Sequence, residues 1–272
     1  KKQGRLPKIA MFGGSVFLFP HPVKELADFL KSYDIHINYD AAHVAGLIAG
    51  GKFQDPLREG VDTITMSTHK TLFGPQGGLV LAFEKDAEAI KKATFPGLTS
   101  SHHIHHMAAK AVTFAEVLEF GKDYAVQTVK NAKALAVTLN GFGFKVLGEK
   151  KGFTQSHQTV VNVLDYGDGG KIEADLEKAN IIVNRQLIPG DIKAKRHYMH
   201  PGGIRLGTSE VTRLGMKESE MEQIASFIKS VVVDNKDAKD IAKQIAEFRK
   251  NYQKVQYCFD NKLGAYEYVK LR

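Results

Sequence analysis

Two spacings of apolar residues alternate over the first 83 positions of the chain. Strand-like runs lie at 8–12, 35–40, 63–67 and 77–83, and segments with helical spacing lie at 22–33 and 41–51. This alternation predicts an α/β domain with a mainly parallel sheet. The last two runs are an exception, because the segment between Ser67 and Gly77 is too short for a crossover helix. We therefore expect the run at 77–83 to pair antiparallel or to lie at a sheet edge.

The rest of the chain opens with a long stretch of helical spacing and continues with mixed segments. Apolar residues recur every three or four positions over 104–140, with an expected break at Gly121-Lys122. Beyond it, strands are expected at 144–148, 159–165, 180–184 and 203–208, and helices at 171–179, 218–232 and 237–253. We place a boundary near Gly121, which gives an α/β domain of residues 1–121 and a smaller α+β domain of residues 122–272.

The composition is that of a folded protein, with 43% hydrophobic and 25% charged residues among 272. Lys and Arg number 38 against 30 Asp and Glu, and the resulting net charge of +8 favours anionic ligands. Most of the lysines recur at helical spacing and are typical of solvated helix faces. Nucleic-acid binding is therefore the weaker interpretation of the charge.

The single cysteine, Cys258, excludes a disulfide within the chain and fits a reducing compartment. No apolar run approaches the ~20 residues of a membrane span, and no signal peptide opens the chain. We expect a cytoplasmic protein that does not enter a membrane. The chain begins with Lys1 rather than Met and leads at once into a strand-like run, so we also expect a missing segment in front of it.

Chemically capable residues gather where the predicted strands end. Asp40 ends one strand, His69 and Lys70 follow another, and Ser15 follows a Gly-Gly pair after the first. His43 lies three residues after Asp40, so we expect it on the first turn of the next helix, facing the same side. Ligands of open α/β sheets bind at the carboxyl ends of the strands. One edge of the sheet is thus predicted to present all five residues.

Each of these residues has an ordinary structural interpretation when it is taken singly. An aspartate at a strand end is often a helix cap, and a loop lysine is usually solvated. Together on one edge, beside a glycine loop, they favour a site. A lysine between buried strands has its ammonium disfavoured by desolvation, as a lysine that forms a covalent link to a carbonyl requires. A nearby carboxylate would suit the ring nitrogen of pyridoxal phosphate.

Three motifs carry a resemblance to a known family. The segments "YDAAHVAGLIAGG", "STHKTLFGPQGG" and "GGIRLGTSEVTRLGM" resemble serine hydroxymethyltransferase, a fold-type-I pyridoxal phosphate enzyme, in order and spacing. The resemblance covers nearly the whole chain, from "MFGGS" to the last helices, and corresponds to the C-terminal two-thirds of the family's chain. It implies the mainly parallel sheet of the large cofactor domain, with its N-terminal part missing and with the bridging helix, followed by the small α+β domain.

The resemblance assigns roles to the residues at the sheet edge. Lys70 resembles the lysine that binds the cofactor covalently, and Asp40 resembles the partner of the pyridine nitrogen. His43 and Ser15 resemble the groups near the ring and its phenolic oxygen. His69 matches the histidine before the lysine.

Two further positions follow from the same motifs. Ser67 stands where the family usually has a threonine beside the cofactor. Arg205, in "GIRLGT", resembles the arginine that clamps the carboxylate of serine or glycine. A planar guanidinium suits this bidentate task better than an ammonium does.

The sequence departs from the family in two places. Ser100 and Ser101 replace the two glycines whose backbone amides reach the cofactor phosphate of the partner subunit, so the close approach that glycine permits is in question. The N-terminal third of the family's chain is absent, and with it the phosphate-binding loop, the group that stacks on the ring and a glutamate that acts as acid or base. We expect the chain alone to lack the cofactor and to be inactive.

The resemblance implies reversible transfer of the serine hydroxymethyl carbon to tetrahydrofolate or tetrahydromethanopterin, leaving glycine. It also implies a homodimer in which residues 96–106 of one subunit reach the site of the other. The histidines at 102–106 lack acidic or cysteine ligands, so we expect no metal there.

Two alternatives remain open. A cysteine desulfurase has a similar fold and lysine, but it requires a cysteine on a mobile loop, and we expect Cys258 on a terminal helix. The other is a scaffold without cofactor that keeps only the dimer surface.

Overall fold

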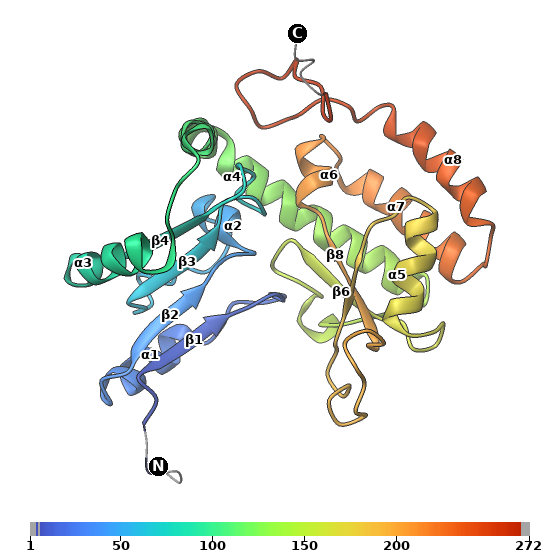
Figure 1. Ribbon diagram of the computed structural model, residues 1–272. Coiled ribbons are helices and arrows are strands. Elements are labelled where there is room, and N and C mark those ends of the chain that lie inside the picture. Colours follow the sequence, from blue (N-terminus) through green and yellow to red (C-terminus); the bar gives the residue numbers. More distant parts are fainter. Residues whose placement is uncertain (1–3, 5, 268–272) are drawn as a thin grey trace. The chain divides into compact units, whose positions relative to one another are not determined.

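The computed structural model (Figure 1) describes residue 4 and residues 6–267 of the chain. The chain divides into two compact units, Lys1–Ala125 and Val126–Arg272. Each unit has its own four-stranded sheet.

The first unit is built on a sheet with the strand order β1-β2-β3-β4. The strands are β1 (Ile9–Gly13), β2 (His36–Asp40), β3 (Thr63–Ser67) and β4 (Gly78–Ala82). The first three are parallel, whereas β4 pairs antiparallel with β3 and lies at the sheet edge. The short connection led us to expect one or the other of these features for the run at 77–83, and the structure shows both.

The two faces of this sheet differ in what covers them. Strand side chains alternate between faces, and the pairing register puts Ile37, Tyr39 and Ile64 on one face, where each is at most 2% exposed. On the other face, Met11 is 64% exposed and Val80 43% exposed. Parallel sheets are usually covered on both faces. The second face therefore carries more exposed apolar surface than such a sheet normally leaves uncovered.

The helices of the first unit include one long element. They are α1 (Val23–Lys31), α2 (Ala45–Ala49), α3 (Glu84–Lys92), the π-turn η1 (Ala93–Leu98) and α4 (Ile104–Gly141). The expected break at Gly121-Lys122 is wrong, because α4 runs through it. A side chain on Gly50 would lie 2.4 Å from the carbonyl oxygen of Gly121, so these glycines mark the place where the end of α2 packs against α4. A glycine at position 121 therefore reflects close packing against α2 and not the end of a helix.

The second unit contains an antiparallel sheet of order β5-β6-β8-β7. The strands are β5 (Lys145–Val146), β6 (Gln158–Asn162), β7 (Asn184–Gln186) and β8 (Gly203–Gly207). The helices are the short η2 (Glu149–Lys151), α5 (Gly169–Lys178), α6 (Ser209–Arg213), α7 (Glu218–Val232) and α8 (Ala238–Arg249). Buried apolar residues of α5, α7, α8 and the second part of α4 form one core with the sheet, among them Leu139, Leu176, Ile204 and Ile228.

Two expectations for this unit are wrong. The strand expected at 180–184 begins only at Asn184, because Asn180 adopts a left-handed conformation that ends α5 and the Ile181 amide bonds back to Leu176. Cys258 does not lie on a helix, since α8 ends at Arg249. Its thiol is buried in the irregular segment that follows, and Sγ lies 3.4 Å from the Val255 carbonyl oxygen and 3.3 Å from that of Asp260, either of which can accept its single hydrogen.

Within the part of the chain that the structure describes, no helix is both long and apolar enough to cross a membrane.

Candidate active site

The carboxyl ends of three parallel strands meet at one edge of the first sheet. Gly13 of β1 pairs with Asp40 of β2, and Asp40 pairs with Thr65 of β3. Ser67 lies two residues beyond Thr65, so its side chain points to the same face as that of Asp40. The structure therefore brings Asp40 and Ser67 to one edge and one face.

Asp40 also shapes the turn that follows it. Its Oδ1 atom accepts a hydrogen bond from the Ala42 amide at 3.0 Å, a local turn that aspartate commonly forms. His43 lies in this turn, immediately before α2 begins at Ala45, and not within the helix as expected. The turn nevertheless keeps the half-buried His43 close in sequence to the strand end.

The first strand ends in the turn that carries Ser15. Gly13 has a φ of 96°, and a side chain there would lie 2.2 Å from the carbonyl oxygen of Asp40. A glycine is required because a left-handed backbone and a close approach coincide. Ser15 follows as an exposed residue, two positions beyond the strand partner of Asp40.

The lysine lies in a loop whose backbone is fixed by Thr68. The Thr68 amide donates to Gly77 at 3.0 Å, its hydroxyl donates to Pro75 at 2.7 Å, and its carbonyl accepts from Gly74 at 2.7 Å. The Lys70 carbonyl accepts from the Phe73 amide at 3.1 Å. The loop is therefore folded on itself and holds Lys70, partly buried, in a defined place. The expectation that two buried strands flank this lysine is wrong for β4, which is largely exposed at the sheet edge.

Thr71 attaches this loop to the start of α2. Its hydroxyl donates to the His43 carbonyl at 2.9 Å and accepts from the Gly46 amide at 3.0 Å. A side chain on Gly46 would lie 2.0 Å from the Thr71 carbonyl oxygen, so the two segments are in direct backbone contact. The residue after Lys70 is thereby bonded to the turn that follows Asp40.

His69 faces solvent from the same loop. Its Nδ1 atom accepts from the Gly77 amide at 3.3 Å. This bond directs the ring toward the glycine segment of its own loop. The structure thus brings Ser15, Asp40, His43, Ser67, His69 and Lys70 to the strand ends of a single sheet.

A buried polar network behind this edge was not predicted. The Gly13 amide donates to Nδ1 of His21 at 3.1 Å, and the side-chain amide of Gln54 bonds both the backbone N–H and the C=O of His21, at 3.0 and 2.6 Å. Tyr39 donates to Gln54 at 2.9 Å, and Glu59 accepts from it. The sequence offers only a weak signal, namely polar residues in otherwise apolar segments.

Burial shifts the ionisation of two members of this network. It lowers the pKa of His21 and, together with the charge of Glu59, raises the pKa of Tyr39. His21 and Tyr39 are therefore both neutral near pH 7.

Arg205 belongs to the second unit. It lies on β8 between Val160 of β6 and Asn184 of β7, and its Nη2 atom donates to the side-chain oxygen of Asn184 at 2.9 Å. Burial lowers the pKa of Arg205, yet a guanidinium remains charged at neutral pH. A charged, half-buried arginine on a sheet is suited to bind a carboxylate in two-point fashion.

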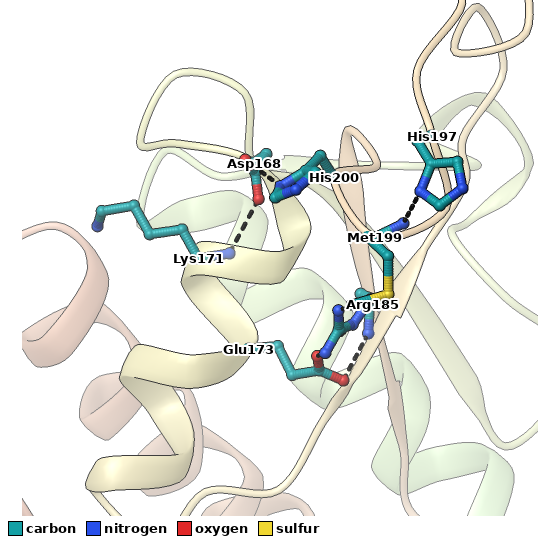
Figure 2. Close-up of polar contacts among 7 residues, drawn as sticks. All are labelled: Asp168, Lys171, Glu173, Arg185, His197, Met199 and His200. Atoms are coloured by element: carbon teal, nitrogen blue, oxygen red, sulfur yellow. Dashed lines mark hydrogen bonds and ion pairs between the residues drawn. The ribbon is translucent and has the colours of Figure 1, made fainter.

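The loop between β7 and β8 is held to the start of α5, as Figure 2 shows. Asp168 accepts from the Lys171 amide at 2.9 Å and pairs with His200 at 3.1 Å, and these contacts lower the pKa of Asp168. Glu173 of α5 pairs with Arg185 of β7. These bonds tie the strand next to Arg205 to a helix.

Ser100 and Ser101 are exposed in the segment between η1 and α4. The rings of His103, His105 and His106 nearby have centroids 4.5–5.4 Å apart. Among the described residues, no group of three or more His, Cys, Asp or Glu side chains could hold a metal ion.

The mixed sheet, with its parallel strands and antiparallel edge strand, is consistent with part of a fold-type-I transferase domain. Residues 2–228 match the family described as serine hydroxymethyltransferase. The chain belongs to the serine hydroxymethyltransferase family.

Relatives of known name agree with this membership. The chain is 79% identical to a serine hydroxymethyltransferase of Nitrosopumilus maritimus and 74% identical to one of Cenarchaeum symbiosum, each over 272 residues. Each match covers 100% of this chain but only 62% of the relative's length.

A solved structure supports the fold. The crystal structure of an L-threonine transaldolase from Pseudomonas fluorescens in its internal aldimine state superimposes with a TM-score of 0.84 at 34% identity. The match covers 94% of this chain and 58% of the other. Like the two relatives, the transaldolase is considerably longer than the segment that it shares with this chain.

Proposed function

We propose that this chain is part of a pyridoxal-phosphate-dependent serine hydroxymethyltransferase. Such an enzyme converts serine and a reduced pterin reversibly into glycine and the methylene-pterin. The observation that carries the proposal is the connection of Asp40 to the Lys70 loop through the His43 carbonyl and Thr71. Family membership supports the reaction, which neither the sheet nor the loop could identify by itself.

The residues of the sheet edge fit the cofactor. Asp40 uses Oδ1 for the Ala42 amide, and among the described residues no hydrogen bond engages its Oδ2 atom. This oxygen suits a protonated pyridine nitrogen. When bound, the cofactor would withdraw electrons from the bonds at the α-carbon of the amino acid.

Each side chain then has a role. Lys70 would hold the cofactor covalently through Nζ, and Asp40 would keep the ring nitrogen protonated. His43 would lie against the ring, and Ser15 would donate toward the phenolic oxygen. His69 and Ser67 would border the covalent link from the lysine loop and from β3.

The remaining roles involve substrate and partner. Arg205 would bind the carboxylate of serine or glycine with its guanidinium. The backbone amides of Ser100 and Ser101 would reach the cofactor phosphate of a second subunit in a homodimer. The one-carbon carrier would be tetrahydrofolate or tetrahydromethanopterin, and the enzyme would act in the cytoplasm. The first unit would belong to the cofactor domain, which the sequence predicts at residues 1–121, and the second unit to the small domain, which it predicts at residues 122–272.

The test uses a hybrid protein, in which this chain replaces the matching 272 residues of the Nitrosopumilus maritimus relative. Pyridoxal phosphate is titrated into the hybrid protein and into the chain alone, and visible absorbance is followed before and after borohydride reduction. Serine is then supplied with each carrier, and glycine is measured. We expect the hybrid protein to bind the cofactor and to form glycine with one carrier.

The alternatives give different outcomes in the same experiment. A hybrid protein without a visible band would be a scaffold, and release of sulfide from cysteine would indicate a desulfurase. The buried Cys258, whose thiol lies within hydrogen-bond distance of two carbonyl oxygens, does not favour the desulfurase. Failure of the hybrid protein to form glycine with either carrier would contradict the proposal.

A further inference from the structure

The turn that carries Ser15 depends on a residue that lies outside the motifs of the family. The segment from Gly14 to Pro22 connects β1 to α1, and its end folds back so that the His21 ring meets the start of the turn. The contact is the hydrogen bond from the Gly13 amide to Nδ1 of His21, 3.1 Å long. Gly13 is also the strand partner of Asp40, so the bond acts beside the proposed cofactor site.

The His21 ring is held in place from two sides. It stacks on the fully buried Phe17 with a centroid distance of 4.8 Å and an interplanar angle of 23°. Its backbone is held by Gln54, which is only 7% exposed. Neither the ring nor the backbone can move without losing these contacts.

Gln54 itself has a single possible orientation. Its oxygen accepts from the His21 amide and from Tyr39, and its nitrogen donates to the His21 carbonyl and to Glu59. All four hydrogen-bonding positions of the side-chain amide are thus used, and a flipped amide would lose the two bonds to the His21 backbone and the bond to Glu59. Gln54 therefore fixes the position of His21 relative to β2, which carries Tyr39.

The hydrogen bond also determines the tautomer of the imidazole. A backbone N–H can only donate, so Nδ1 of His21 must carry a lone pair, and the proton of the neutral ring is on Nε2. A protonated ring would direct an N–H toward the Gly13 N–H. The arrangement requires an acceptor at this position of the side chain.

We propose that His21 is a positioning residue, which holds the Gly13–Ser15 turn against the end of β2 through a neutral imidazole with its acceptor at Nδ1. It acts through Gly13 and Ser15 and does not itself touch the cofactor. The role of the turn in cofactor binding rests on the proposed function. The effect of His21 on the position of the turn is independent of the proposed function.

Two substitutions separate the acceptor from the ring. His21→Phe keeps an aromatic ring on Phe17 but removes the acceptor. His21→Asn removes the ring but places an oxygen on the atom next to Cβ, where Nδ1 stood. The control is His36→Phe, which removes the 3.0 Å bond between His36 and Thr63 at the opposite end of β2.

The first measurement is deuterium exchange over the segment that contains Gly13, in the hybrid protein without cofactor. We expect His21→Phe to accelerate exchange of this amide about three- to tenfold, whereas His21→Asn and His36→Phe leave it near the parent rate. Nitrogen-15 NMR of histidine-labelled protein should show His21 as the neutral tautomer with its proton on Nε2. Equal protection in His21→Phe and the parent, or equal loss in His21→Asn and His21→Phe, would overturn the proposal.

The second measurement is the dissociation constant of pyridoxal phosphate. We expect it to rise about three- to tenfold in His21→Phe and to change less than about twofold in His21→Asn and His36→Phe. An unchanged constant in His21→Phe would show that the turn does not serve the cofactor. If even the parent binds no cofactor, the proposed function fails, while deuterium exchange still decides the role of His21.

Discussion

At the scale of single residues, Lys70 has the clearest expected outcome. In the hybrid protein, Lys70→Ala should abolish the covalent link to pyridoxal phosphate and leave the fold intact, because the surrounding bonds of the loop come from Thr68 and Thr71. Borohydride reduction followed by peptide mass spectrometry locates the adduct in the parent and in the variant. A pyridoxyl adduct on another lysine of the parent would refute the assignment.

Substitution of Arg205 should weaken the binding of the amino acid and leave the binding of the cofactor unchanged. An ammonium cannot reproduce a two-point contact, so Arg205→Lys should weaken serine and glycine binding by about 1.5–3 kcal/mol, roughly ten- to 150-fold. Arg213→Lys is the matched control, because Arg213 lies in the same motif but donates to the Tyr257 carbonyl. Titration with serine measures both variants. Equal affinities in Arg205→Lys and in the parent would place the carboxylate elsewhere.

The ionisation of His21 should contribute to the pH dependence of the free energy of unfolding. The pKa of the folded His21 ring is lowered by burial. As the pH falls below about 6.5, the unfolded chain therefore binds a proton at His21 before the folded chain does, and the free energy of unfolding decreases. His21→Phe lacks this term, and its stability deficit relative to the parent should shrink between about pH 7.5 and about pH 5.5. Urea denaturation at several pH values measures the deficit. A deficit that is constant over this range would contradict a lowered pKa of the folded His21 ring.

Sequence reasoning reached the residues that belong to continuous motifs and missed those whose partners are distant. Asp40, His43, His69 and Lys70 lie in short segments whose strand ends could be predicted from apolar spacing. The partner of His21 is Gln54, 33 positions away, and neither residue type indicates the other. Contacts of this kind arise only from the fold.

At the scale of elements, Thr71 connects the lysine loop to α2. Thr71→Val keeps the shape but leaves the buried Gly46 amide without its acceptor, which should lower the free energy of unfolding by about 1–3 kcal/mol. Thr71→Ser keeps the hydroxyl and should lower the free energy of unfolding by less. Urea denaturation of the hybrid protein measures both. A Thr71→Val midpoint equal to that of the parent would show that the connection contributes nothing.

Element boundaries were predicted least well where packing overrides local preference. Gly121 suggested a helix break, but α4 continues because the glycine lies where the end of α2 packs against it. The apolar run at 180–184 suggested a strand, but its first residues close α5 instead. The antiparallel pairing of 77–83 was correct because connection length alone required it.

At the scale of the whole molecule, the first unit exposes apolar side chains on its sheet and in η1 and α4, among other places. Met11 is 64% exposed on the sheet, and Leu98 is 87% and Leu118 89% exposed in η1 and α4. Exposed apolar surface of this extent usually marks an interaction site. Further protein, such as a second subunit, would cover it.

The homodimer prediction follows from this surface. The resemblance places residues 96–106 at the site of a second subunit, and Leu98 lies within this segment. In the hybrid protein, Leu98→Glu would bury a charge in the interface and should shift the dimer toward the monomer. Ile182→Glu is the matched control, because Ile182 is 78% exposed in the second unit. Sedimentation equilibrium measures the dimer fraction of both variants. If the parent is a stable monomer, or if Leu98→Glu and Ile182→Glu dimerise equally, the segment does not form the interface, and Ser100 and Ser101 cannot reach a partner's cofactor.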